Sequence, residues 1–293
     1  MARIGVFADR NTLNNSGEMG AIFRLSHAAQ KMGHRLDVIF RPEMYKIPSY
    51  DALFIRTLTD PLNAAYVAAR LAQMNGLRVI DDPDSIIICC DKVNMYRHLQ
   101  NRKVPMPDTV FLDRHEITKA RALELFEILG NPIVLKAPSG SFSKSVEKVH
   151  TPEEFVKFGK LYSLRACRIE AQRFSPSKFD WRVGVLGGEV LYVCQYGIPK
   201  NRWKIHTYDK GRDISGTVTT FHPSEVNPLL LETARQAAAA IGHGFYGVDL
   251  KQIGQHFIVI EVNDNPTIAE DEEDQDNPQL YERIIGYLAG SWG

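Results

Sequence analysis

The sequence predicts an α/β (α+β) protein that begins with a parallel, Rossmann-like sheet and ends with an antiparallel β-hairpin. Three observations favour this class. Strand-like and helix-like segments alternate over the first 85 residues, the 293 residues suffice for about two domains, and two β-branched runs near the C-terminus flank a short polar break. Strands that alternate with helices are typical of parallel sheets, whereas two adjacent runs indicate an antiparallel pair.

Composition argues against several classes of protein. Lys plus Arg and Asp plus Glu both number 35, so the zero net charge gives no general attraction to nucleic acid or a membrane surface. The four cysteines form no C-x-x-C pair, which indicates a reduced, cytoplasmic protein. There is no signal-type apolar core and no apolar run of about 20 residues. We expect no nucleic-acid or membrane partner, and homo-oligomerisation stays open.

The N-terminal segment supplies the predicted parallel sheet. Strands are expected at 3–8, 35–40, 52–56 and 77–80, with helices over 17–32 and 62–75. The turn after the first strand lacks G-x-G-x-x-G, so a dinucleotide fingerprint is missing. Arg56 ends the third strand, where ligands meet such sheets, so it is a candidate substrate residue. The alternative is a surface or domain-interface arginine.

The next segment places two lysines near a loop of small residues. Asp91 is expected to cap a helix over 92–101, which puts Lys92 in the first turn, where the helix dipole disfavours a cation unless an anion is nearby. After a strand at 108–112 and a helix at 120–129, the strand 132–136 ends at Lys136. The loop that follows contains Ser139, Gly140, Ser141 and Ser143. Such loops can donate N–H and O–H groups to phosphate, although most are only connections.

The following elements lead into a cationic segment. A helix over 152–161 and a strand over 168–171 precede a hairpin of 179–186 and 189–196, whose turn is Gly187-Gly188. Residues 200–206, if extended, place Lys200, Arg202, Lys204 and His206 on one face. Two interpretations weigh about equally: a solvated edge strand, and a cationic strip for carboxylate or phosphate groups.

The C-terminal hairpin carries the strongest signal of chemistry. After a helix capped by Asn227, Asp249 lies on the first strand, and Glu261 and Asn263 lie on the second. Because side chains alternate, the two carboxylates share a side only if the loop has an odd number of residues, so we predict three or five. A carboxylate in an apolar run needs a partner or a metal, and this all-oxygen set suits Mg²⁺. The alternative is an exposed polar face.

An acidic run at 270–276 follows, before a last helix at 278–288. We expect a solvated segment, with an electrostatic lure for an amine substrate as the alternative.

In this order and spacing, these residues resemble the ATP-grasp superfamily, most closely its RimK-type glutamate ligases and glutathione-synthetase-like enzymes. The resemblance extends from about residue 3 to the C-terminus. Its most specific part is Gly247-Val248-Asp249-Leu250 followed by Glu261-Val262-Asn263. It implies an ATP-grasp fold with a Rossmann-like pre-ATP-grasp domain at 1–85, a small lid subdomain at 86–171 and a C-terminal subdomain at 172–293.

The resemblance also implies roles for single residues. Lys92 and Lys136 would contact ATP phosphates, with the 139–145 loop as a lid, and Arg182 would act on the transferring phosphoryl group. The backbone of Gln172, Arg173 and Phe174 would bind adenine. Many relatives resemble Gln-Glu-Phe at these three positions, whereas this chain has Arg173 in the position of the glutamate. Asp249, Glu261 and Asn263 would hold two Mg²⁺ ions, or Mn²⁺ in their place.

The implied activity is an ATP-dependent carboxylate–amine ligase that works through an acyl phosphate. It would join an amino acid such as glutamate to a small molecule or a peptide. We expect the acceptor pocket among Arg56, Lys200, Arg202, Lys204 and Asn265. A phosphotransferase on the same site and a nucleotide-binding regulator without catalysis remain alternatives.

Overall fold

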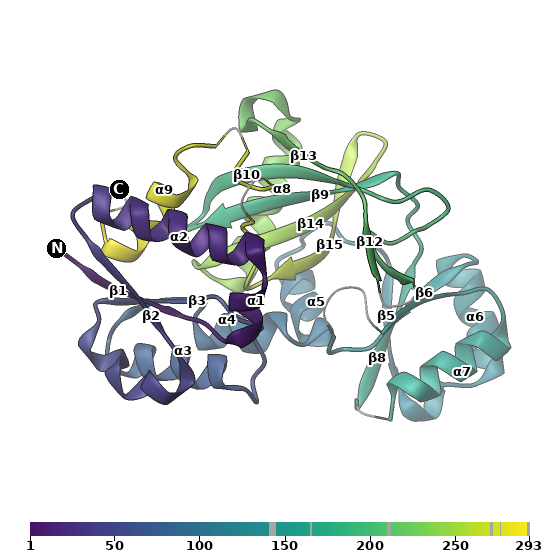
Figure 1. Cartoon of the computed structure of the whole chain (residues 1–293). Helices are drawn as coiled ribbons and strands as arrows, with labels where there is room; N and C mark the ends of the chain where they lie inside the picture. The colour runs from purple at the N-terminus through teal and green to yellow at the C-terminus, as the bar shows by residue number, and fades with distance from the viewer. Residues whose placement is uncertain (141–144, 165, 210–211, 270–271, 276, 292–293) are drawn as a thin grey trace.

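The computed structural model describes the chain apart from residues 141–144, 165, 210–211, 270–271, 276 and 292–293 (Figure 1). The predicted mixed α/β architecture is confirmed. The described residues form a parallel sheet, two larger antiparallel sheets and a two-stranded ribbon.

The N-terminal sheet is parallel, as predicted, with strand order β2-β1-β3-β4. Its strands are β1 (Arg3–Phe7), β2 (Arg35–Ile39), β3 (Ala52–Ile55) and β4 (Arg78–Ile80). The connecting helices are α1 (Arg10–Asn14), α2 (Ser16–Lys31), the 3₁₀ helix η1 (Arg41–Ser49) and α3 (Ala64–Met74). Fully buried apolar strands such as Ala52–Ile55 show why this sheet needs helices on its faces.

The second sheet is antiparallel, in the order β5-β8-β6-β7. Its strands are β5 (Thr109–Asp113), β6 (Ile133–Lys136), β7 (Val146–Val149) and β8 (Arg168–Arg173). Helices α6 (Lys119–Leu129) and α7 (Pro152–Tyr162) complete a separate core around Leu135 and Phe155. The 3₁₀ turn η2 (Arg114–Glu116) leads into α6.

The third sheet carries the predicted hairpins in the order β13-β10-β9-β14-β15. Its strands are β9 (Phe179–Leu186), β10 (Glu189–Gly197), β13 (Val218–Phe221), β14 (Phe245–Ile253) and β15 (His256–Asn263). The turn between β9 and β10 is Gly187-Gly188, with φ of +59° and +91° that only glycine adopts readily. One face of β9, with Trp181 and Val183, belongs to the apolar core shared with helix α8 (Pro228–Ile241). The opposite face carries Arg182.

The cationic segment is not the extended strand that we considered. Residues 200–205 form turns and bends, and strand β11 (His206–Asp209) begins only at His206, where it pairs with β12 (Arg212–Ser215). Pro199 accepts a turn hydrogen bond from the amide of Arg202 at 3.0 Å. This turn replaces the alternation that would have aligned the charges on one face.

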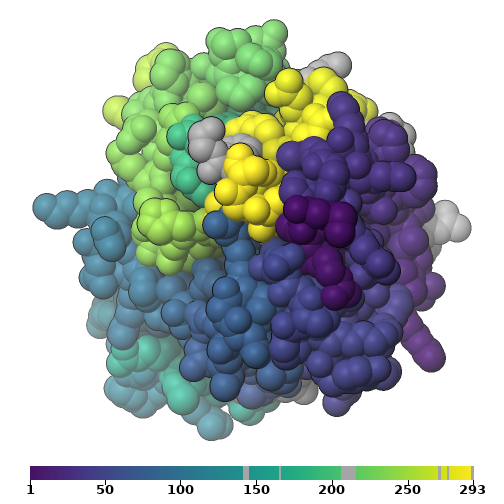
Figure 2. Space-filling view, turned by 90° about the vertical axis from the view of Figure 1, so that its left-hand side faces the viewer, coloured from purple at the N-terminus to yellow at the C-terminus, as the bar shows by residue number. Residues whose placement is uncertain are grey.

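Two helices pack across the predicted domain boundaries. Helix α5 (Lys92–Asn101), which follows α4 (Pro83–Cys89), buries Met95 and Leu99 in the core of the third sheet. Helix α9 (Leu280–Ala289), which follows the 3₁₀ turn η3 (Pro223–Glu225) and the hairpin, joins the core of the N-terminal sheet. Figure 2 shows the yellow C-terminal segment between the purple N-terminal part and the green part of the chain. Among the helices of the described residues, none is long and apolar enough to cross a membrane.

Candidate active site

The hairpin of β14 and β15 brings Asp249 and Glu261 together by a route that we did not predict. The turn has two residues, Gly254 and Gln255, so the predicted three- or five-residue loop is wrong. A β-bulge supplies the missing residue: Leu250 pairs with Val259, but Asp249 pairs with Glu261, which leaves Ile260 as the extra residue. Both Ile260 and Glu261 consequently line the same cleft.

Asp249 is held by the neighbouring strand on its other side. Its partner across β9 is Arg182, whose Nε and Nη2 donate to the two carboxylate oxygens at 2.7 and 2.8 Å. The amide of Asn263 donates to Asp249 Oδ2 at 3.2 Å. The three predicted residues Arg182, Asp249 and Asn263 therefore share one face of the sheet and one hydrogen-bonded group.

Glu261 is paired with the lysine whose helical position was anomalous. Lys92 is the first residue of α5, and its Nζ lies 2.6 Å from Glu261 Oε1 and 3.0 Å from the carbonyl oxygen of Gly140. Burial by itself would raise the pKa of Glu261, but the ammonium of Lys92 outweighs it, so that pKa is lowered. The negative charge of Glu261 thereby offsets the unfavourable interaction of the Lys92 ammonium with the positive N-terminal end of the helix dipole.

Lys136 ends β6 and is 5 % exposed. Its Nζ donates to the hydroxyl of Tyr96 on α5 at 2.9 Å, and burial lowers its pKa. Its cross-strand partner on β8 is Glu170, a fully buried side chain whose carboxylate oxygens have no hydrogen-bond partner among the described residues. Burial raises the pKa of Glu170 to about 8, although Lys136 and Lys92 act in the opposite direction.

The cleft between the second and third sheets has an apolar end. Phe174 and Trp203 meet there edge to face with ring centroids 5.9 Å apart, and Lys148 Nζ lies 4.7 Å from the centre of the Phe174 ring. The apolar lining is completed by Val134, Val146, Ile205 and Ile260. The predicted hinge residues Gln172, Arg173 and Phe174 all line this cleft. The side chain of Arg173 donates to Asp108 at 2.8 Å, so an ion pair engages the residue that departs from the family pattern.

The structure separates the other predicted site residues. Lys204 lines the cleft and donates to the carbonyl oxygen of Val146, whereas Lys200 and Arg202 are exposed and lie outside its lining. Ser139 and Gly140 are exposed at the start of the proposed lid. Ser141 and Ser143 lie outside the described residues.

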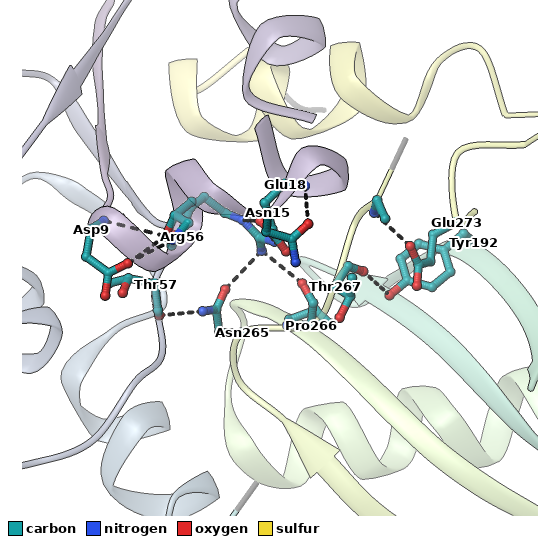
Figure 3. Close-up of polar contacts among 12 residues, drawn as sticks. Asp9, Asn15, Glu18, Arg56, Thr57, Tyr192, Asn265, Pro266, Thr267 and Glu273 are labelled. Atoms are coloured by element: carbon teal, nitrogen blue, oxygen red, sulfur yellow. Dashed lines mark hydrogen bonds and ion pairs between the residues drawn. The ribbon is translucent and has the colours of Figure 1, made fainter. Parts of the chain in front are cut away.

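Arg56 lies at the junction of the N-terminal sheet and the segment after β15. It is 3 % exposed, and its Nε and Nη2 donate to the Glu18 carboxylate at 2.6–3.2 Å (Figure 3). Its Nη1 donates at 2.9 Å to Asn265 Oδ1 and to the carbonyl oxygen of Pro266. Asn265 in turn donates to the carbonyl oxygen of Thr57 at 2.6 Å. These contacts favour the domain-interface alternative for Arg56.

The acidic run is not simply solvated, contrary to the expectation. Glu273 is fully buried, and it accepts from the amide of Ala269 at 2.7 Å and from the hydroxyl of Tyr196. Asp274 lies 3.4 Å from Arg24. Residues 270, 271 and 276 lie outside the described residues. A buried carboxylate with two donors holds this segment against β10.

The donor set of the hairpin fits Mg²⁺. Within the described ranges, no group of three or more His, Cys, Asp or Glu side chains is placed to hold a metal ion. The two carboxylates of Asp249 and Glu261 are nevertheless cross-strand partners, and the amide of Asn263 lies beside Asp249. Carboxylate and amide oxygens are the ligands that a hard cation prefers. Both carboxylates now neutralise cations of the protein instead.

Four residues of this region escaped the sequence analysis: Tyr96, Glu170, Tyr196 and Trp203. Glu170 carried a weak signal, because it lies between the apolar residues Ile169 and Ala171. The other three are aromatic residues, whose usual place in a core hides a role in a site.

Comparison with known proteins agrees with this geometry. Residues 89–268 match the ATP-grasp domain family. The glutamate–LysW ligase ArgX of Sulfolobus acidocaldarius is 27 % identical over 225 residues, which are 74 % of each chain. The α-aminoadipate–LysW ligase LysX of Saccharolobus solfataricus is 25 % identical over 264 residues, 83 % of this chain and 87 % of that relative.

The fold is also similar to a solved structure. The RimK domain ATP-grasp protein of Sphaerobacter thermophilus superposes with a TM-score of 0.68 at 18 % identity, covering 98 % of this chain and 99 % of that one. The family match covers more than half of the 293 residues and includes both lysines and all three proposed metal ligands. The chain therefore belongs to the ATP-grasp family.

Proposed function

We propose that the protein is an ATP-dependent carboxylate–amine ligase that forms an amide bond through an acyl phosphate. The observation that carries this proposal is that Asp249, Glu261, Lys92 and Lys136 line one cleft, with Asn263 hydrogen-bonded to Asp249 beside it. Family membership and relatives that are named ligases support the same reaction.

The cleft suggests how a nucleotide would bind. Adenine would enter the apolar end beside Phe174 and Trp203 and hydrogen-bond to the backbone of 172–174. The phosphates would extend toward Lys92 and Lys136, and Ser139 and Gly140 would contribute donors beside them. The predicted phosphate contacts Ser141 and Ser143 lie outside the described residues. Lysine ammonium groups in a water-poor cleft are suited to developing phosphate charge.

Asp249, Glu261 and Asn263 would hold the metal, and we propose two Mg²⁺ ions, with Mn²⁺ as a substitute. Bound Mg²⁺ would supply positive charge against the phosphate oxygens. For Asp249 and Glu261 to serve as ligands, their ion pairs with Arg182 and Lys92 have to open. Opening releases one guanidinium and one ammonium beside the cleft, where both can contact phosphoryl oxygens.

The reaction needs no nucleophile from the protein. A carboxylate oxygen of the first substrate attacks the γ-phosphorus, and the bond from that phosphorus to ADP breaks. The amine of the second substrate then attacks the acyl carbon, the carbon–oxygen bond to phosphate breaks, and the nitrogen loses a proton. Arg182 is placed to stabilise the charge of the transferring group.

The relatives' names favour an acidic amino acid as one substrate, since glutamate and α-aminoadipate both carry a side-chain carboxylate. The second substrate would be a small molecule or a peptide. Among the acceptor residues considered, Lys204 lies in the nucleotide cleft, Arg56 is engaged by Glu18, and Asn265 is hydrogen-bonded to Arg56 and Thr57. We propose that the acceptor pocket lies beside Asn265, which is two residues beyond Asn263, with Lys200 and Arg202 as outer contacts.

The test is a pairwise screen of amino acids and short peptides with ATP and Mg²⁺, followed by mass spectrometry. Phosphate should appear only when an acid and an amine are both present, together with an amide product. Asp249→Asn should lower the rate at least about 100-fold, whereas Asp113→Asn should not, because Asp113 pairs with Arg168 at the end of β5 that does not line the cleft. A stable phosphorylated product without free phosphate would instead identify a phosphotransferase.

A further inference from the structure

In the proposed metal-bound state, Arg182 loses the ion pair with Asp249 that holds it in this structure. In this structure Asp249 binds the guanidinium with both carboxylate oxygens, at 2.7 and 2.8 Å. A carboxylate that binds a metal has at most one oxygen left for such a pair. Something else has to hold Arg182 if it is to stay in place when Asp249 changes partner.

Tyr196 is in position to do so. Arg182 and Tyr196 lie on the same face of adjacent strands β9 and β10, and the guanidinium carbon lies 4.9 Å from the centre of the Tyr196 ring. Tyr196 is only 7 % exposed, so water competes little for this cation–π contact. The contact is independent of Asp249.

Glu273 fixes the other end of the tyrosine. It is fully buried, and one of its oxygens accepts from the Tyr196 hydroxyl while the other accepts from the Ala269 amide at 2.7 Å. A phenol that donates to a carboxylate carries more negative charge on its ring, which strengthens its attraction for a cation. The buried carboxylate thus both orients the ring and increases its hold on Arg182.

The segment that carries Glu273 is itself attached to this face. The hydroxyl of Tyr192 donates to the carbonyl oxygen of Thr267 at 3.2 Å (Figure 3). Pro266 lies over Gly247, where an added Cβ would come within 2.7 Å of the proline ring. These contacts keep the segment, and with it Glu273, close to the hairpin of β14 and β15.

We propose that Tyr196 and Glu273 are positioning residues that hold Arg182 beside the cleft when Asp249 releases the guanidinium to bind the metal. This inference rests on the proposed nucleotide and metal site. It assigns a role to the acidic run: Glu273 acts through Tyr196 on the group that contacts the γ-phosphate.

The test compares the binding of Mg·ADP with that of a non-hydrolysable Mg·ATP analogue by calorimetry, so it needs no substrate and no turnover. Arg182→Met should reduce the preference for the analogue over ADP, because only the analogue has a γ-phosphate. Glu273→Gln and Tyr196→Phe keep the ring but alter the charged hydrogen bond that orients it, so each should reduce this preference about two- to threefold, a part of one cation–π contact. Glu272→Gln, an exposed neighbour on the same segment, is the matched control.

Two further results decide the outcome. In the double variant Arg182→Met/Glu273→Gln, the preference should equal that of Arg182→Met alone, because Glu273 acts only through Arg182. If Arg182→Met leaves the preference unchanged, the proposed role of Arg182 fails. If it lowers the preference while Glu273→Gln and Tyr196→Phe do not, or if the effects multiply in the double variant, the positioning role is overturned. ADP affinity in every variant reports whether the site is folded.

Discussion

Lys92 and Glu261, 169 residues apart in the chain, form an ion pair of 2.6 Å at the centre of the cleft. The ammonium of Lys92 is therefore bound to the same Glu261 carboxylate that a metal ion would need as a ligand. In the proposed site, Lys92 and a metal ion would compete for Glu261 as long as no nucleotide is present. The phosphate oxygens of a bound nucleotide would offer Lys92 another anionic partner and would end the competition.

This competition predicts opposite effects of one substitution on two ligands. Lys92→Met should strengthen binding of Mn²⁺ or Mg²⁺ alone, because Glu261 loses its competing cation, and should weaken ATP binding, because a phosphate contact is lost. Thermal shift with metal alone and calorimetry with nucleotide measure the two effects. Lys119→Met removes an exposed lysine paired with Glu153 and should change neither. Parallel changes in both affinities would contradict the competition.

Glu170 predicts a pH-dependent stability. Its pKa is raised from 4.5 to about 8, so it is protonated in the folded chain but ionised in the unfolded chain between these values. The folded state then binds more protons, and its stability falls as pH rises from about 4.5 to 8. Glu170→Gln removes this loss, which is on the order of 5 kcal/mol at 1.36 kcal/mol for each pKa unit.

The melting temperature of Glu170→Gln relative to the unsubstituted chain should therefore increase between pH 5 and pH 8, by about 10 °C at 2–4 °C per kcal/mol. Glu127→Gln, on the exposed face of α6, is the control and should show no such trend. An equal effect of Glu170→Gln at both pH values would mean that the carboxylate is ionised in the folded chain as well as in the unfolded chain.

Trp203 predicts a contribution to nucleotide affinity that is separate from the phosphate contacts. It closes the apolar end of the cleft against Phe174. Trp203→Ala should weaken ADP binding about tenfold, in keeping with about 1–3 kcal/mol for stacking of a base on an aromatic ring, whereas Trp203→Phe should keep most of the affinity. The ratio of ATP to ADP affinity should not change, because the proposed binding mode puts the γ-phosphate at Lys92 and Lys136 and the adenine at Trp203. A change in that ratio would place Trp203 elsewhere.

Local patterns were enough to predict most of the elements and the central pair of carboxylates. The helix that begins after Asn227 and the turn at Gly187-Gly188 follow from cap and turn chemistry, which acts over a few residues. The pairing of Asp249 with Glu261 was predicted for a wrong reason. A bulge at Ile260, rather than an odd loop, sets it, and a bulge has no clear signature in one sequence.

The roles that depend on partners distant in the chain could not be predicted from the sequence. Nothing near Glu273 in the sequence indicates that Tyr196 will bury it, and the charge pattern of 270–276 favours solvent. Likewise, the alternation of charges in 200–206 suggested a strand, but the turn at Pro199 prevents it. In both cases tertiary contacts override the local pattern.

Arg56, which is paired with Glu18, predicts an energetic link between the N-terminal sheet and the segment that follows β15. The Arg56 side chain is 2 % exposed and that of Glu18 17 %, and Arg56 also holds Asn265 and Pro266. Arg56→Met leaves the partly buried Glu18 without its partner, which should cost unfolding free energy at the lower end of about 3–5 kcal/mol. In the double variant Arg56→Met/Glu18→Met, part of this loss should return, since no charge is left unpaired. Thermal or urea unfolding of the single and double variants measures the coupling between the two residues.

A second ion pair provides the matched control. Lys31 and Glu282 also join helix α2 to the C-terminal segment, at 2.6 Å, but the lysine side chain is 66 % exposed. Lys31→Met should cost less than about 1 kcal/mol, because an exposed pair gains little over its hydrated ions. If Arg56→Met proves as mild as Lys31→Met while the binding of an acidic amino acid is lost, Arg56 would be a substrate residue, as its place at the end of β3 first suggested. A large loss of stability would identify Arg56 as a structural contact between the N-terminal sheet and the segment after β15 of the third sheet.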